Sequence, residues 1–230
     1  MRIVGYFLLV FVVLYVLRHV PGLGELFRIP FLGFIIASAL VSFAISWSTV
    51  RAVDRRRARV LERELRGTVE TPHNQGKLGS LLLAQGRASK AVPHLERASA
   101  GEPNLAEWHY RLGTAYLHSR RPADAVRSLE RAATLDEEHA YGSVLLRLAQ
   151  AQRAAGDPQA SLATLQRFER NHGPNPESAF RRGLALKALG RRSEAMTALS
   201  EVSRLAAQAA RFQKSQQRGY VVRALLARVV

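Results

Sequence analysis

Four basic side chains recur at nearly constant spacing in the second half of the chain. They are separated by 34, 36 and 34 residues, and they are Lys77, Arg111, Arg147 and Arg181. A guanidinium group is planar and offers paired N–H donors, so it can bind both oxygens of one carboxylate. Arg153 and Lys187 add two cations near the last two members of this basic column. The column therefore predicts binding of an acidic segment or a free C-terminus, if the fold places its members on one surface.

The chain offers little that could carry out catalysis. It has no cysteine, which excludes thiolate nucleophiles, disulfides and cysteine-based zinc sites. Its seven histidines show neither HExxH pairing nor carboxylates at metal-ligand spacing, and no glycine-rich phosphate loop follows a strand-like run. We therefore expect no enzymatic activity, no metal and no cofactor, and a function that rests on binding.

The spacing of the basic column is shared by residues that could form a core. Three columns repeat with the same offsets: Gly79, Gly113, Ala149 and Gly183; Ala91, Ala125, Ser161 and Ala195; and Leu95, Leu129, Leu165 and Leu199. A period of this length is typical of helix-turn-helix solenoids, in which each unit buries its apolar face against its neighbours. Pro122 and Pro158 follow turn residues and suit the first turn of a helix. The sequence thus predicts an all-α fold.

The pattern resembles the tetratricopeptide repeat (TPR), in which an aromatic residue, Leu-Gly, Tyr, and then Ala, an apolar residue and Ala recur. The second unit matches best, with Trp108, Leu112, Gly113, Tyr116, Ala125, Leu129 and Ala132. The fourth unit departs from the pattern, because Arg182 stands where Leu is expected. The resemblance implies a solenoid over 71–204, with four repeats at about 72–105, 106–139, 142–175 and 176–204.

A C-terminal helix is expected after the repeats, at 205–230. Its apolar residues fall on one stripe: Val221, Val222, Leu225, Leu226 and Val229. A solenoid needs its last face covered, so we expect this helix to act as a cap. A basic amphipathic helix can also lie on a membrane surface, which is the alternative.

The TPR resemblance also implies where the basic column lies in the fold. In TPR proteins this position of the first helix faces the concave groove, where extended peptides or partner helices bind. The candidate groove residues are Lys77, Arg111, Arg147, Arg181, Arg153 and Lys187. A solvated helix face is the alternative explanation of the column. Receptors for chaperone tails use Asn in a neighbouring column, where this chain has Ser80, Thr114, Gln150 and Leu184, so such a receptor is not expected.

Two apolar runs precede the repeats and predict a transmembrane hairpin over 1–50, with helices at about 3–20 and 31–50. The second run has no charge and is long enough for a hydrocarbon core of roughly 30 Å. A cleaved signal peptide is the alternative for the first run. Ser38, Ser42 and Ser46 recur every four residues in the second run, a stripe that could support a homodimer.

A basic juxtamembrane helix is predicted over 51–70. Its arginines include a cluster that could contact lipid headgroups or only set the topology: Arg51, Arg55, Arg56, Arg57 and Arg59. The positive-inside rule places this side in the cytoplasm. We therefore predict an integral protein of a bacterial inner membrane with cytoplasmic repeats.

The formal net charge of the chain is +16 and its pI is about 11.3. This excess of basic residues makes nucleic-acid binding an alternative function, along with lipid-surface binding. Arginine outnumbers lysine 30 to 4, a bias that genome composition alone can produce. The sequence as a whole predicts a membrane-tethered adaptor or scaffold whose basic groove recruits a protein partner with an acidic segment.

Overall fold

The computed structural model describes residues 71–208 and 214–229, together with isolated positions nearer the N-terminus. These positions are Val12, Tyr15, Ser38, Val41, Ser42, Arg59, Val60, residues 62–65 and Gly67. The chain divides into two compact units, Met1–Leu61 and Glu62–Val230, and the helices below belong to the second. Every regular element between 71 and 229 that the structure describes is an α-helix.

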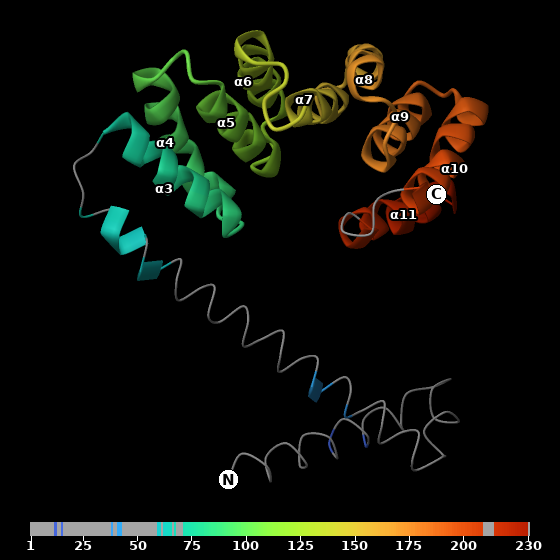
Figure 1. Ribbon diagram of the computed structural model, residues 1–230, viewed down its shortest axis with the longest axis horizontal. Coiled ribbons are helices and arrows are strands. Elements are labelled where there is room, and N and C mark those ends of the chain that lie inside the picture. The colour runs from blue at the N-terminus through green and yellow to red at the C-terminus, as the bar shows by residue number, and fades with distance from the viewer. Residues whose placement is uncertain are drawn as a thin grey trace. The chain divides into compact units, whose positions relative to one another are not determined.

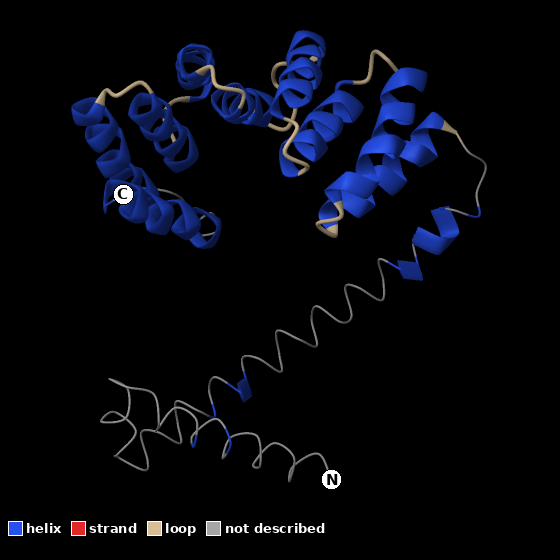
Figure 2. Ribbon diagram, turned by 180° about the vertical axis from the view of Figure 1, so that it is seen from behind, coloured by secondary structure: helices blue, strands red, loops and turns tan. Residues whose placement is uncertain are grey.

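Four helix pairs follow one another along the described residues of the second unit (Figures 1 and 2). The pairs are α3 (Pro72–Ala84) with α4 (Ala88–Gly101), α5 (Ala106–His118) with α6 (Pro122–Leu135), α7 (Ser143–Ala154) with α8 (Pro158–His172), and α9 (Pro176–Ala188) with α10 (Arg192–Gln208). Each helix packs on its pair mate and on the next helix in the chain, and first helices of successive pairs also touch. The all-α solenoid of helix pairs predicted from the sequence is therefore confirmed.

Local sequence explains where these helices begin and end. Proline occupies the first turn of α3, α6, α8 and α9, where its missing N–H removes no helical hydrogen bond. The side chain of Asn175 accepts a hydrogen bond from the Ser178 N–H at 2.8 Å, and the Ser178 hydroxyl accepts one from the Asn175 N–H at 3.0 Å. This capping box satisfies donors that the first turn of α9 leaves free. Gly86, with φ of 75°, takes the left-handed conformation just after α3.

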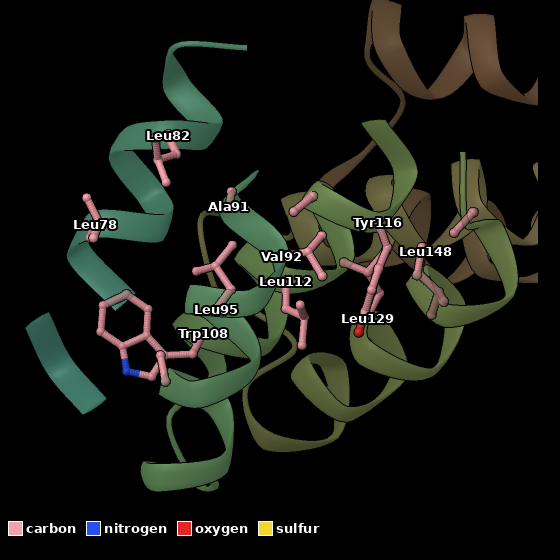
Figure 3. Close-up of a cluster of buried hydrophobic side chains, with 14 residues drawn as sticks. Leu78, Leu82, Ala91, Val92, Leu95, Trp108, Leu112, Tyr116, Leu129 and Leu148 are labelled. Carbon is pink, nitrogen blue, oxygen red and sulfur yellow. The ribbon is translucent and has the colours of Figure 1, made fainter. Parts of the chain in front are cut away.

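Close approach between pair mates depends on the small-residue column. A Cβ added to Gly113 would lie 2.5 Å from Leu129 Cγ and 3.2 Å from the Ala125 carbonyl oxygen. Leu129 is fully buried, so the glycine lets α5 lie against the leucine of α6. Figure 3 shows Leu129 in the same cluster as Leu95 and Trp108. The Trp108 ring fits against Gly76 of α3, which joins the first two repeats.

The C-terminal segment differs from the single helix expected over 205–230. Helix α10 continues to Gln208, and a separate helix α11 (Lys214–Val229) packs on α9 and α10. Its contacting side includes Ala224, which is fully buried, and Tyr220 and Val221, which are partly buried, so Val221 of the expected stripe does pack inward. Val222, Leu225 and Leu226 of the expected stripe are instead exposed. Val221, Ala224 and Ala227 are spaced three residues apart and share one side of α11, whereas Val222, Leu225 and Leu226 fall on other sides.

No helix in the described part of the chain is long and apolar enough to cross a membrane. The longest, α10, has 17 residues, or about 25 Å, against roughly 30 Å for a hydrocarbon core. This finding overturns the prediction of an integral membrane protein with cytoplasmic repeats. The expected hairpin helices at 3–20 and 31–50, and the homodimer through the second, lie outside the described residues except at isolated positions.

We predict that Gly113→Ala lowers the free energy of unfolding by about 1–3 kcal/mol, because the new methyl group overpacks against Leu129 and the helix backbone. Gly219→Ala in α11 is the matched control, since an added Cβ there meets no atom within 4 Å. Higher helix propensity should make that variant more stable by about 0.5–1 kcal/mol. Urea denaturation followed by circular dichroism measures both, and an equal gain in the two variants would contradict the packing argument.

Candidate functional site

The basic column lies on the first helices of the four repeats. Lys77 is on α3, Arg111 on α5, Arg147 on α7 and Arg181 on α9. Because α3 touches α5, α5 touches α7 and α7 touches α9, these helices form a continuous inner layer of the solenoid (Figure 1). Lys77 is exposed, whereas the three arginines are half-buried.

Two members of the column are paired with a glutamate one turn earlier on the same helix. Arg111 pairs with Glu107, and Glu107 Oε2 also lies 2.6 Å from His139 Nε2. Arg181 pairs with Glu177, and its Nε donates to Glu177 Oε1 at 3.0 Å. These arginines are therefore partly neutralised and held in place by the fold.

Gln150 joins the arginines of the last two repeats. Its Oε1 accepts a hydrogen bond from Arg181 Nη1 at 2.7 Å and another from Arg147 Nη1 at 3.2 Å. The amide oxygen is neutral, so it brings two guanidinium groups together without cancelling their charge. The result is a local excess of positive charge between α7 and α9.

A pocket of about 400 Å³ opens beside this bridge, and we call it the basic pocket. Its lining comes mainly from α7, α9 and α11: His118, Arg147, Ala149, Gln150, Arg153, Ser161, Phe180, Arg181, Leu184, Tyr220 and Arg223. Four arginines thus line it, and no aspartate or glutamate is among these described lining residues. The arrangement suits an anionic group that can accept several hydrogen bonds.

Helix α11 forms one wall of the basic pocket. Tyr220 packs against Phe180 of α9 with ring centroids 5.9 Å apart, and the Arg223 guanidinium lies 5.8 Å from the Tyr220 ring centre. Lys187 Nζ donates to the Ala227 carbonyl oxygen at 3.0 Å, close to the C-terminal end of α11. A cation is favourable there because helix carbonyls lack partners at that end. Lys187 therefore contacts α11 and does not line the basic pocket.

Burial and charge shift the pKa values of three groups in this region. Burial raises the pKa of Glu177, but the charge and hydrogen bond of Arg181, with smaller effects of Tyr220 and Arg147, outweigh it, so the pKa falls below its usual value. Burial and the Glu177 charge raise the pKa of Tyr220 to about 12, so its hydroxyl stays protonated near neutral pH. Burial, and then the Arg181 charge, lower the pKa of Arg153.

The structure brings together three residues proposed from the sequence, Arg147, Arg153 and Arg181, while Lys77 and Arg111 lie outside the basic pocket. Sequence reasoning missed five polar residues of the lining: His118, Gln150, Ser161, Tyr220 and Arg223. Two of them had a periodic signal, Gln150 in the column beside the basic one and Ser161 in a core column. The two in α11 had none, because they follow the last repeat.

Two other site predictions have different outcomes. Of the predicted lipid-facing cluster, Arg51, Arg55, Arg56 and Arg57 lie outside the described residues, whereas Arg59 is helical and exposed. Within the described ranges, His, Asp and Glu side chains nowhere gather in a group of three that could hold a metal ion.

Solved structures with the same architecture include those of other TPR proteins. MamA is 18% identical, with a TM-score of 0.56 over 74% of this chain and 94% of MamA. TTC0263, a thermophilic TPR protein in Thermus thermophilus, is also 18% identical, with a TM-score of 0.58 over 78% of this chain and 95% of its own. MamA from Desulfovibrio magneticus RS-1 is 13% identical, with a TM-score of 0.54 over 68% of this chain and 94% of its own. At these identities the likeness shows the fold alone.

No curated protein matches the chain. A family model described as tetratricopeptide repeat matches residues 77–140 and 146–212, which together make up more than half of the sequence. Proteins of this family are generally scaffolds without enzymatic activity. On the fold, the repeated columns and this match, the chain belongs to the tetratricopeptide repeat family.

Proposed function

We propose that the protein is an interaction scaffold whose inner layer recruits a partner through an acidic segment or a free C-terminus. The observation that supports this most strongly is the basic pocket, where four arginines meet without a lining carboxylate among the described residues. Desolvated guanidinium groups gain free energy when a carboxylate supplies the missing acceptors. A partner segment along α7 and α9 would provide them.

The arginines differ in how available they are for a partner. Arg181 is already paired with Glu177, and its side chain is only 11% exposed. Arg147 donates to the neutral Gln150, and Arg153 makes no hydrogen bond or ion pair with any residue that the structure describes. Arg147 and Arg153 are therefore the residues that we propose bind the partner, with Arg111 extending the surface toward the N-terminal repeats.

The first prediction concerns affinity for a fluorescein-labelled peptide of five glutamates with a free C-terminus. Replacing Arg147 and Arg153 together by glutamine should weaken binding about tenfold or more, because each charge-assisted hydrogen bond contributes about 1.5–3 kcal/mol. Fluorescence anisotropy with the full chain measures the change. Removing Arg153 should not lower the melting temperature, since a desolvated cation without a carboxylate does not stabilise the fold.

The matched control is the double substitution of Arg97 and Arg170 by glutamine, which removes the same charge from exposed sites on α4 and α8. This control should retain nearly full affinity. Equal weakening in both double variants would show that only the net charge matters and would contradict a specific site. Competition by a single-stranded RNA oligonucleotide, with steep salt dependence, would instead favour the nucleic-acid alternative.

The second prediction concerns the framework of Glu177, Arg181 and Tyr220, which positions α9 and α11. Because the pKa of Glu177 is lowered in the folded chain, its stabilising effect is complete above the unfolded value near 4.5 and is lost as the pH falls through the folded value. The melting temperature of Glu177→Gln should be lower than that of the unmodified protein at pH 7, and the gap should close below about pH 4.5. Melting temperatures of both proteins, recorded at intervals between about pH 3 and about pH 7, give this difference.

Glu130→Gln serves as the control for this experiment, because Glu130 is an exposed glutamate on α6. Its gap to the unmodified protein should be small and should not change with pH in the same way. A constant gap for Glu177→Gln across the range would show that the carboxylate charge is not what stabilises this region.

A further inference from the structure

The basic pocket holds more positive charge than one carboxylate can balance. Its lining includes Arg147, Arg153, Arg181 and Arg223, and only Arg181 is paired with a carboxylate in the described residues, that of Glu177. Within the same part of the chain, the other three guanidinium groups therefore have no carboxylate in an ion pair. A carboxylate brings a single charge and two oxygens, which leaves part of this set unused.

The other lining groups keep the pocket electropositive. Tyr220 stays a neutral phenol because its hydroxyl donates to Glu177 and its pKa is raised to about 12. Gln150 turns its oxygen toward two arginines, so its acceptor is already in use. Phe180 and Leu184 add an apolar part to the lining.

We propose that the basic pocket binds a phosphomonoester carried on the side chain of a peptide partner. Such a group has a charge of about −1.5 to −2 at neutral pH and three strong acceptor oxygens. Arg147 and Arg153 of α7 and Arg223 of α11 line the pocket, and their guanidinium groups are the donors that suit such an anion. The volume of about 400 Å³ lies within the range of ligand pockets. The pocket is lined by α7 and α9, two of the first helices that form the inner layer.

This assignment rests on the proposed scaffold function and adds a chemical preference to it. It also gives α11 a role in binding, because Arg223 and Tyr220 come from that helix. A groove made of first helices alone would lack this wall. Ligand recognition is therefore expected to depend on α11 being docked through contacts such as Lys187 to Ala227.

The test uses three peptides that differ at one position. The first is the pentaglutamate probe, and in the others its central glutamate is replaced by phosphoserine or by serine. We expect the full chain to bind the phosphopeptide at least about tenfold more tightly than the glutamate peptide, and the serine peptide most weakly. Binding should also move the second phosphate pKa, about 6 in the free peptide, to lower pH in a phosphorus NMR titration, because nearby arginines favour the dianion.

Substitutions on one helix provide the matched comparison. Arg223→Gln should reduce the preference for phosphoserine severalfold, whereas Arg228→Gln, which removes the same charge from an exposed site of α11 outside the lining, should leave it unchanged. Arg153→Gln should reduce the preference about tenfold. Circular dichroism confirms that each variant keeps its helices.

The outcomes separate this inference from the scaffold function. Equal affinity for the phosphoserine and glutamate peptides, with an unchanged phosphate pKa, would overturn the phosphate site while leaving the scaffold intact. Binding of neither peptide would count against both. Equal affinity for free O-phosphoserine and for the phosphopeptide would overturn the peptide-borne ligand, since the neighbouring repeats would then contribute nothing.

Discussion

The contact between a small residue on each first helix and a leucine on each second helix is the constraint on which the solenoid depends. Where Gly113 faces Leu129, the side chain is absent so that two helix backbones can approach. Gly79 and Gly183 stand in the same relation to Leu95 and Leu199. This repeated approach makes each helix pair alike, and like pairs stack with a constant offset. The offset is what aligns the first helices in one layer.

Because the first helices are aligned, residues that lie one repeat apart in the sequence can become neighbours in space. Arg147 and Arg181 are 34 residues apart, yet both donate to the one oxygen of Gln150. Charges of equal sign would otherwise separate, and the fold holds them together with carboxylates such as Glu177 placed one helical turn away. The repeat thus concentrates cations on the inner layer of first helices.

Most of the fold was predictable because it is encoded by periodic residues. The glycine, alanine and leucine columns predicted helix pairs, and in three of them the turn between the helices contains a glycine with positive φ: Gly86, Gly156 and Gly190. The column of cations predicted Arg147 and Arg181 as neighbours of one site. Tyr220 and Arg223 belong to no repeated column, because α11 lies outside the repeats, so the sequence did not predict them as site residues. The inward face of α11 was predicted only in part, because Val221 packs inward beside Ala224 whereas the more apolar Leu225 is exposed.

Arg182 stands where the other repeats have leucine, and it replaces the apolar contact of that leucine by ion pairs. Its guanidinium pairs with Glu169 of α8 and with Glu201 of α10, the latter through a second nitrogen. One side chain thereby ties three consecutive helices with ionic contacts at a junction where other repeats use apolar packing. An ion pair of this kind has fewer favourable geometries than an apolar contact, because the planar guanidinium binds each carboxylate along its N–H directions. The junction between the third and fourth repeats, α8 to α9, should therefore flex less than the junctions α4 to α5 and α6 to α7.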